Sequence, residues 1–181
     1  MIFSNTDIEG LIIIDTKKFI DDRGYFFETF QHQKFCEFIG EDIKFVQENE
    51  SMSSINVVRG LHFQAPPYAQ GKLVRVPFGK ILDVVVDIRN NSSTYGKTFS
   101  IELSQANGKQ LFIPEGFAHG FVCLEENSLL NYKCTNYYNQ ASEDAILWKS
   151  ENLGIDWNVK RPILSEKDQN AKDFSTFVSP F

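Results

Sequence analysis

The sequence predicts an all-β fold, either a β-sandwich or a jelly-roll barrel. Eight short runs of strand-forming residues follow one another from about residue 44, and no helical pattern alternates with them. Turn-forming residues separate these runs at near-regular spacing. The aromatic content is 14%, with 17 phenylalanines, and this composition suits both strand packing and an aromatic-lined pocket.

The N-terminal part of the chain predicts a strand, a turn and a helix. Residues 11–14 are apolar and predict a strand, residues 21–24 have turn composition, and the aromatic stretch 25–30 favours β-structure. Residues 31–39 carry apolar side chains at helical spacing, and Gly40 predicts the end of this helix.

The central part of the chain predicts strands over residues 45–47, 57–63, 72–76, 81–88, 98–103, 110–113, 119–124 and 129–135. Asn107 and Gly108 lie between two of these runs and form the strongest β-hairpin signal in the chain. From about residue 150 we expect a helical C-terminal tail, in which Ser165 caps a short helix and Asp168 occupies the capping-box position. No linker or repeat is visible, so residues 1–181 predict a single domain.

The bulk composition restricts the class of protein. The formal net charge of -6 argues against a nucleic-acid binder, although it permits a local cationic pocket for one nucleotide. The three cysteines, Cys36, Cys123 and Cys134, lack the spacing of a disulfide framework and suggest a reducing compartment. No signal peptide and no long apolar stretch are visible, so we expect a cytoplasmic protein without a membrane partner.

Two predicted strands carry polar residues on a face that should be apolar. The two-residue period of a strand places Lys72 on the same face as Val74, and Tyr132 on the same face as Cys134. A lysine inside a barrel is unfavourable unless it meets an anionic ligand or reaches water at the barrel mouth. A tyrosine there can donate a proton, or it can simply pack with its hydroxyl bound to a carbonyl.

Histidines mark two further segments. Arg59 and His62 flank a glycine that lets the strand bend, and His119 stands between two glycines before an aromatic run. Each histidine taken alone is as well explained by packing or by a tight turn. With His32 these are all the histidines, they form no His-x-His or His-x-x-x-His pair, and Gln64 stands where a second ligand would be expected. The sequence therefore predicts an organic acid–base site without a metal.

These segments together resemble a family of enzymes, the deoxythymidine-diphosphate (dTDP)-4-dehydrorhamnose 3,5-epimerases of the metal-free cupin group. The resemblance is carried by residues 22–24, 27–28, 47–49, 59–64, 66–67, 70–74, 83–89, 113–121, 132–133, 137–138, 143 and 164–168. It implies a cupin-type jelly-roll barrel with a few short peripheral helices. It also implies a homodimer in which the N-terminal strands are exchanged.

The resemblance further implies roles for individual residues. His62 would be the general base, with Asp168 as its orienting carboxylate. Tyr132 would be the general acid on the opposite side, and Lys72 the cation near the developing enolate. The residues implied to bind the sugar and the nucleotide are Arg23, Glu28, Gln47, Asn49, Arg59, His119, Tyr138, Glu143 and Lys167. Tyr138 would stack on thymine, and no cofactor is implied.

The implied reaction is inversion of C3 and C5 of dTDP-4-dehydro-6-deoxy-D-glucose, which gives dTDP-4-dehydro-L-rhamnose for dTDP-L-rhamnose biosynthesis. The ketone at C4 acidifies the neighbouring protons, so the reaction needs a base, an opposing acid and positive charge at the enolate oxygen. Three alternatives stay open on sequence alone. These are an epimerase acting at one centre of a related nucleotide sugar, a non-catalytic sugar-binding cupin, and a metal-dependent dioxygenase.

Overall fold

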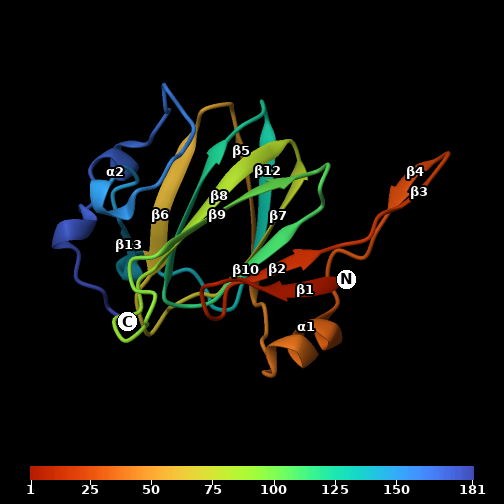
Figure 1. Ribbon diagram of the computed structural model, residues 1–181, viewed down its shortest axis with the longest axis horizontal. Helices are drawn as coiled ribbons and strands as arrows, with labels where there is room; N and C mark the ends of the chain where they lie inside the picture. The colour runs from red at the N-terminus through yellow and green to blue at the C-terminus, as the bar shows by residue number, and fades with distance from the viewer.

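The computed structural model describes residues 1–181, which form two antiparallel sheets packed face to face (Figure 1). The strand order is β1-β2-β10-β7-β12-β5 in the six-stranded sheet and β13-β6-β11-β8-β9 in the five-stranded sheet. This architecture confirms the predicted all-β, cupin-type jelly-roll fold with few helices.

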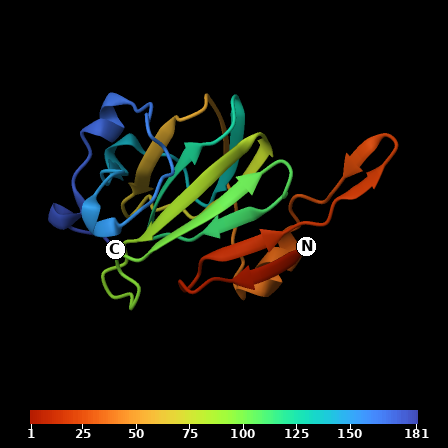
Figure 2. The same ribbon diagram turned by 45° about the horizontal axis from the view of Figure 1, so that its top comes forward.

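The six-stranded sheet contains β1 (Ile2–Asn5), β2 (Ile12–Asp15), β5 (Gln47–Ser53), β7 (Lys72–Phe78), β10 (Gln110–Ile113) and β12 (Ser128–Cys134). The five-stranded sheet contains β6 (Val58–Gln64), β8 (Lys80–Asp87), β9 (Thr98–Ser104), β11 (Phe117–Cys123) and β13 (Glu143–Ala145). A separate hairpin of β3 (Phe19–Asp21) and β4 (Gly24–Phe26) extends away from both sheets as an arm (Figures 1 and 2).

The helices are short and peripheral. They are α1 (His32–Ile39), α2 (Glu166–Gln169) and the 3-10 turns η1 (Gln140–Ser142), η2 (Glu151–Leu153) and η3 (Phe174–Thr176). None of them has the length and apolar character needed to cross a membrane. The segment that carries η2, α2 and η3 lies beside the five-stranded sheet, on the side away from the arm (Figures 1 and 2).

Apolar side chains form three clusters, one between the sheets and one on each outer face. The cluster between the sheets includes Val74 and Leu111 of one sheet and Val85 and Phe121 of the other. The C-terminal segment covers the outer face of the five-stranded sheet with Leu153, Trp157 and Phe177. Helix α1, with Phe35 and Ile39, covers the outer face of the six-stranded sheet together with Phe30 from the segment before it. Because β8 is covered on both faces, it reads as a nearly continuous apolar run.

Helix α1 forms where its apolar spacing predicts it. At its start the Gln31 side chain accepts a hydrogen bond from the Lys34 backbone nitrogen at 2.6 Å. At its end Gly40 adopts a left-handed conformation with φ of 81°, and its N–H donates to the Cys36 carbonyl at 2.8 Å. This glycine turns the chain back along the helix, which brings residues 42 and 43 beside the helix surface.

The β-hairpin predicted at Asn107 and Gly108 is wrong. The two residues do form a tight turn, since the Gly108 N–H donates to the Ser104 carbonyl at 3.0 Å and Gly108 has φ of 63°. The strands that the turn joins lie in different sheets, however: β9 pairs with β8, and β10 pairs with β2 and β7. The dipeptide specifies a reversal of the chain, whereas burial of the strand faces decides which strands pair.

Asp87 holds the loop between β8 and β9 through a buried carboxylate. It accepts hydrogen bonds from Arg89 Nε at 2.9 Å, from Ser92 Oγ at 2.6 Å and from Thr94 Oγ1 at 2.6 Å. Burial alone would raise the pKa of Asp87, but these hydrogen bonds outweigh it and lower the pKa from 3.8 to about 2.

We expect acid to destabilise the fold through Asp87. The pKa of Asp87 is lower in the folded protein than in the unfolded chain, so ionised Asp87 stabilises the fold above about pH 4. This stabilisation is lost as the pH falls to about 2. The contribution corresponds to about 2 kcal/mol. Urea unfolding at about pH 6 and about pH 2 measures most of it. The Asp87→Asn variant should be less stable at the higher pH and lose less on acidification, and an unchanged pH dependence in the variant would contradict this.

Candidate active site

A cavity of about 120 Å³ between the two sheets holds the most concentrated set of ionisable side chains in the barrel. Its lining residues are Gln47, Asn49, His62, Phe63, Gln64, Gln70, Lys72, Tyr132, Tyr138 and Glu143. Seven of these are residues that the sequence resemblance assigns to the site. The structure therefore brings together side chains from β5, β6, β7, β12, β13 and the segment after β12.

The two sheets contribute different chemical groups to this cavity. His62 comes from β6 of the five-stranded sheet, while Tyr132 of β12 and Lys72 of β7 come from the six-stranded sheet. The register between β12 and β7 pairs Tyr132 with Val74 and Cys134 with Lys72, so Lys72 and Tyr132 lie on adjacent inward positions. An imidazole therefore faces a phenol and an ammonium across one space.

His62 is held by a buried carboxylate. Its Nε2 lies 2.5 Å from Asp168 Oδ1, and the Asp168 side chain is only 4% exposed. The Ser165 hydroxyl donates to Asp168 Oδ2 at 2.7 Å and also accepts from the Asp168 backbone nitrogen at 3.1 Å. Burial would raise the pKa of Asp168, but the hydrogen bonds from His62 and Ser165 lower it below its ordinary value. Asp168 is therefore ionised at neutral pH and fixes the orientation of the imidazole.

The same contacts account for helix α2. Ser165 is its N-cap, as the sequence predicts. The Asp168 side chain binds the Ser165 hydroxyl instead of the Ser165 backbone N–H that a capping box would use. The helix therefore serves to place the carboxylate against His62, and its third residue, Asp168, is the only buried one.

An irregularity in β6 turns two residues toward the cavity side. Val58, Leu61 and Phe63 all pack on the outer face of the sheet, whereas Arg59 reaches Ser53 on the opposite sheet and His62 lines the cavity. Side chains on one face of a regular strand are two residues apart, so Arg59 and His62, which are three apart, cannot share a face without an irregularity. The pairing of β6 with β11 accordingly shifts register between His119 and Phe121. Gly60, with φ of 122°, lies inside this irregularity, as its predicted bend requires.

We expect Gly60→Ala to destabilise the fold by about 3 kcal/mol or more and to displace His62. A Cβ at this position would lie 2.5 Å from Gly120 Cα and 2.8 Å from the His119 carbonyl oxygen, both in the backbone of the paired strand. The matched control is Gly154→Ala, where φ is also positive but no atom lies within 4 Å. That variant should lose only about 1–2 kcal/mol in denaturant unfolding. Equal losses in both variants would contradict the close-packing explanation.

Burial shifts the pKa values of the two ionisable cavity residues on the six-stranded sheet toward their uncharged forms. Burial lowers the pKa of the Lys72 ammonium, against the opposing effect of Cys134, Asp83 and Glu143. Burial raises the pKa of the Tyr132 phenol, so the hydroxyl stays protonated at neutral pH and can donate.

A second histidine–carboxylate pair lies beside the first. His119 of β11 is directly paired with His62 in the sheet, and its Nε2 lies 2.8 Å from Asp83 Oδ1 of β8. Both side chains are buried, and Asp83 Oδ2 has no hydrogen-bond partner. Sequence reasoning gave Asp83 no role. The available signal was a carboxylate inside the apolar run of β8, because a buried charge needs a partner.

The rim of the cavity is a small polar network centred on Glu143. Lys167 Nζ lies 2.6 Å from Glu143 Oε2, and the Tyr138 hydroxyl donates to the same oxygen at 3.0 Å. Burial opposes ionisation of Glu143, but Lys167 and Tyr138 lower its pKa below the ordinary value. The Tyr138 backbone N–H donates to Gln47 Oε1 at 2.9 Å, and its ring is half-exposed. These contacts leave an aromatic face open to solvent beside the cavity.

Six residues assigned to the site by resemblance do not line this cavity in the single chain. Asp168, His119 and Lys167 adjoin lining residues as described above, whereas the other three have different partners. Arg23 lies at the tip of the arm and pairs with Asp21, with 90% of its side chain exposed. Glu28 pairs with Lys34 of α1 at 3.1 Å. Arg59 donates from Nε to a serine of β5 at 3.1 Å.

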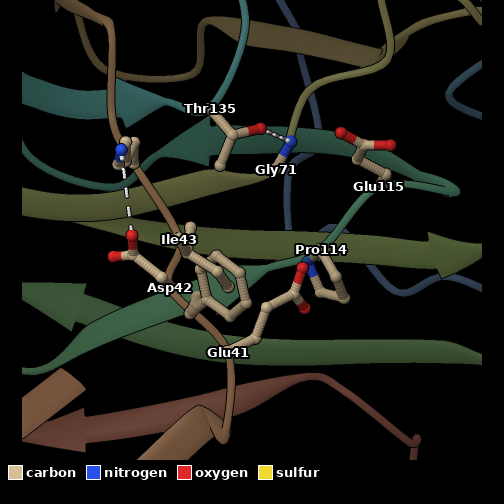
Figure 3. A pocket seen from close by; sticks show the side chains of 9 residues that line it. Glu41, Asp42, Ile43, Gly71, Pro114, Glu115 and Thr135 are labelled. Atoms are coloured by element: carbon tan, nitrogen blue, oxygen red, sulfur yellow. Dashed lines mark hydrogen bonds and ion pairs between the residues drawn. The ribbon is translucent and has the colours of Figure 1, made fainter. Parts of the chain in front are cut away.

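A larger cavity of about 600 Å³ lies outside the barrel, between the loop after α1 and the end of β10 (Figure 3). It is lined by Glu41, Asp42, Ile43, Lys44, Gly71, Phe112, Pro114, Glu115 and Thr135. Burial and the charge of Glu41 raise the pKa of Glu115. The cavity contains no histidine or tyrosine, so it lacks the opposed base and acid of the smaller cavity. The smaller cavity is therefore the candidate active site.

Comparisons with known proteins agree with this assignment. The family model described as dTDP-4-dehydrorhamnose 3,5-epimerase matches residues 5–176. The Salmonella typhimurium dTDP-4-dehydrorhamnose 3,5-epimerase is 51% identical over 172 residues, which cover 94% of each chain. The crystal structure of the Elizabethkingia anophelis dTDP-4-dehydrorhamnose 3,5-epimerase is 46% identical, has a TM-score of 0.92 and covers 97% of each chain.

A third relative was solved with a sugar nucleotide. The Legionella pneumophila dTDP-6-deoxy-D-glucose-3,5-epimerase, in complex with dTDP-4-keto-L-rhamnose, is 43% identical with a TM-score of 0.93 and covers 97% of this chain and 94% of its own. The matched family model spans nearly the whole chain, including every strand of both sheets apart from the first residues of β1. The chain therefore belongs to the dTDP-4-dehydrorhamnose 3,5-epimerase family and is an isomerase, as the resemblance implied.

Proposed function

We propose that this protein inverts C3 and C5 of dTDP-4-dehydro-6-deoxy-D-glucose to give dTDP-4-dehydro-L-rhamnose. The observation that carries the proposal is the shared cavity in which His62 of one sheet faces Tyr132 and Lys72 of the other. Epimerisation beside a ketone requires a base and an acid on opposite faces of the sugar, and this cavity supplies one from each wall.

His62 is the base in this proposal. Because its Nε2 is bound to ionised Asp168, the proton of the neutral imidazole resides on Nε2 and the lone pair on Nδ1. Nδ1 takes the proton from C3 or C5, and the C–H electron pair moves into the ring to make the enolate at C4. Asp168 stabilises the imidazolium that results.

Tyr132 and Lys72 act on the other side of the ring. The Lys72 ammonium stabilises the negative charge on the enolate oxygen. The neutral Tyr132 hydroxyl then delivers its proton to the carbon from the face opposite His62, which inverts the centre and leaves a phenolate. Proton exchange with solvent restores both residues before the second centre reacts.

The remaining residues bind the rest of the substrate. Tyr138, half-exposed at the rim, offers a ring on which thymine can stack. Gln47, Asn49 and Glu143 present polar atoms to the cavity, and Lys167 neutralises Glu143. Arg59 and His119 extend the binding surface beside His62, where a forked guanidinium suits the diphosphate.

The proposal includes a homodimer in which residues 1–181 act as one domain and the arms are exchanged. The arm exposes Phe19, Ile20 and Phe26, with exposures of 56%, 80% and 72%, which are high values for large apolar side chains. An arm that crosses to a partner would bury them and carry Arg23 and Glu28 toward the partner's cavity. Sedimentation of the wild type and of Ile20→Asp tests this, and a monomeric wild type would contradict it.

The reaction is tested by turnover of the 4-keto substrate in deuterium oxide, followed by proton NMR. Deuterium at both C3 and C5 is expected. Label at only one carbon would identify an epimerase acting at a single centre, and the absence of label would indicate a protein that binds the sugar without turnover.

A further inference from the structure

We propose that His32, Cys36 and Asp42 form a binding site for a transition-metal ion of the Zn²⁺ class on the outer surface of the barrel. The three side chains are the one group of histidine, cysteine and carboxylate residues whose ligand atoms all lie within 4.8 Å of one another. The site is independent of the proposed reaction, because none of its residues lines the cavity with His62.

The spacing of the candidate ligand atoms suits a tetrahedral ion. His32 Nε2 lies 3.5 Å from Cys36 Sγ and 3.4 Å from Asp42 Oδ1, and Cys36 Sγ lies 4.0 Å from Asp42 Oδ1. Zinc bonds of about 2.0–2.3 Å in tetrahedral geometry place neighbouring ligand atoms about 3.3–3.6 Å apart. A closure of a few tenths of an ångström at one edge would complete this triangle.

A fourth ligand atom lies at the same place. The Ile43 carbonyl oxygen is 3.1 Å from His32 Nε2 and 3.8 Å from Cys36 Sγ. Without metal, this carbonyl accepts a hydrogen bond from Nε2 of the neutral imidazole. A metal ion would occupy the position of that proton, with the carbonyl oxygen or a water molecule as its fourth ligand.

The backbone arranges these atoms in advance. His32 and Cys36 are four residues apart on α1, so both project from one face of the helix. The left-handed turn at Gly40 then returns the chain so that Asp42 and Ile43 lie against that face. Phe35 anchors the helix by complete burial on the six-stranded sheet. The backbone that carries the ligands is therefore already ordered before the ion binds.

The donor set selects the class of ion. A thiolate together with an imidazole favours Zn²⁺ and Co²⁺ over Mg²⁺ and Ca²⁺, which prefer oxygen ligands. Cys36 must lose its proton when the sulfur–metal bond forms, so each bound ion releases one proton to solvent. Lys44 pairs with Asp42 Oδ2 at 3.8 Å, which is the dashed line at Asp42 in Figure 3, and this contact leaves Oδ1 free to bind metal.

Titration of the metal-free, full-length protein with Co²⁺ alone tests the site. We expect thiolate-to-cobalt charge-transfer absorption and the visible bands of tetrahedral Co²⁺, saturating at one ion per chain and abolished by added Zn²⁺. Cys36→Ser and His32→Gln should each weaken binding by about 100-fold or more, because loss of a ligand's supporting partner alone costs about 10–100-fold.

Two control variants locate the binding. Cys134→Ser removes the thiol beside the cavity, and Glu37→Gln removes a carboxylate of the same helix that is outside the cluster. Both should retain the Co²⁺ spectrum. A spectrum that survives Cys36→Ser, or one that disappears in Cys134→Ser, would overturn the proposal. Deuterium incorporation by the metal-free protein is measured separately, so failure of the metal site leaves the proposed reaction untouched.

Discussion

Replacing His62 with asparagine is expected to lower kcat by about 10²–10⁴-fold while leaving the affinity for dTDP nearly unchanged. The imidazole is the only base of the cavity that is oriented by a carboxylate, through the 2.5 Å contact with Asp168. The variant removes the Nδ1 lone pair. An asparagine amide can still donate to the buried carboxylate, so Asp168 is not left as an unpaired charge.

The readouts for His62→Asn separate chemistry from binding. Deuterium incorporation at C3 and C5 should fall together with product formation, because the base removes both protons. Calorimetric titration with dTDP should give the affinity of the wild type, since none of the proposed contacts to thymine or to the diphosphate is made by His62. Retained turnover would show that His62 is not the base. A loss of dTDP affinity as large as the loss of turnover would show that the substitution has disturbed the site as a whole.

The strands with apolar residues on buried faces could be predicted from the sequence, and those without could not. β7 and β8 have such a pattern, and both lie within a residue or two of their predicted bounds. β5 consists largely of polar residues and exposes every second side chain, so only its first residue fell inside a predicted strand. β1 and β13 were not predicted. All four residues of β1 are exposed or half-exposed, and β13 has only three residues, so neither strand carries a clear periodic signal.

The site residues were predictable by type, whereas their meeting in space depends on the fold. Inward positions for Lys72 and Tyr132 follow from the two-residue period alone, and the structure places both in the cavity. The inward direction of Arg59 together with His62 does not follow from that period, since it depends on the irregularity at Gly60. Asp168 reaches His62 from 106 residues away, and no local pattern could have paired them. Long-range contacts of this kind were available only through the family resemblance.

Replacing Tyr132 with phenylalanine is expected to separate proton removal from inversion. The ring keeps its packing against the cluster between the sheets, so the fold should be retained, while the hydroxyl that donates the second proton is lost. His62 still removes protons and can return deuterium to the same face. In deuterium oxide, we therefore expect label in recovered substrate with unchanged configuration, and inverted product slower by about 10²–10⁴-fold. Tyr95→Phe is the matched control, since Tyr95 packs against Phe174 away from the cavity, and it should behave as the wild type. If exchange and inversion fall equally in Tyr132→Phe, the phenol positions the substrate instead of protonating it, and the two-sided mechanism is wrong.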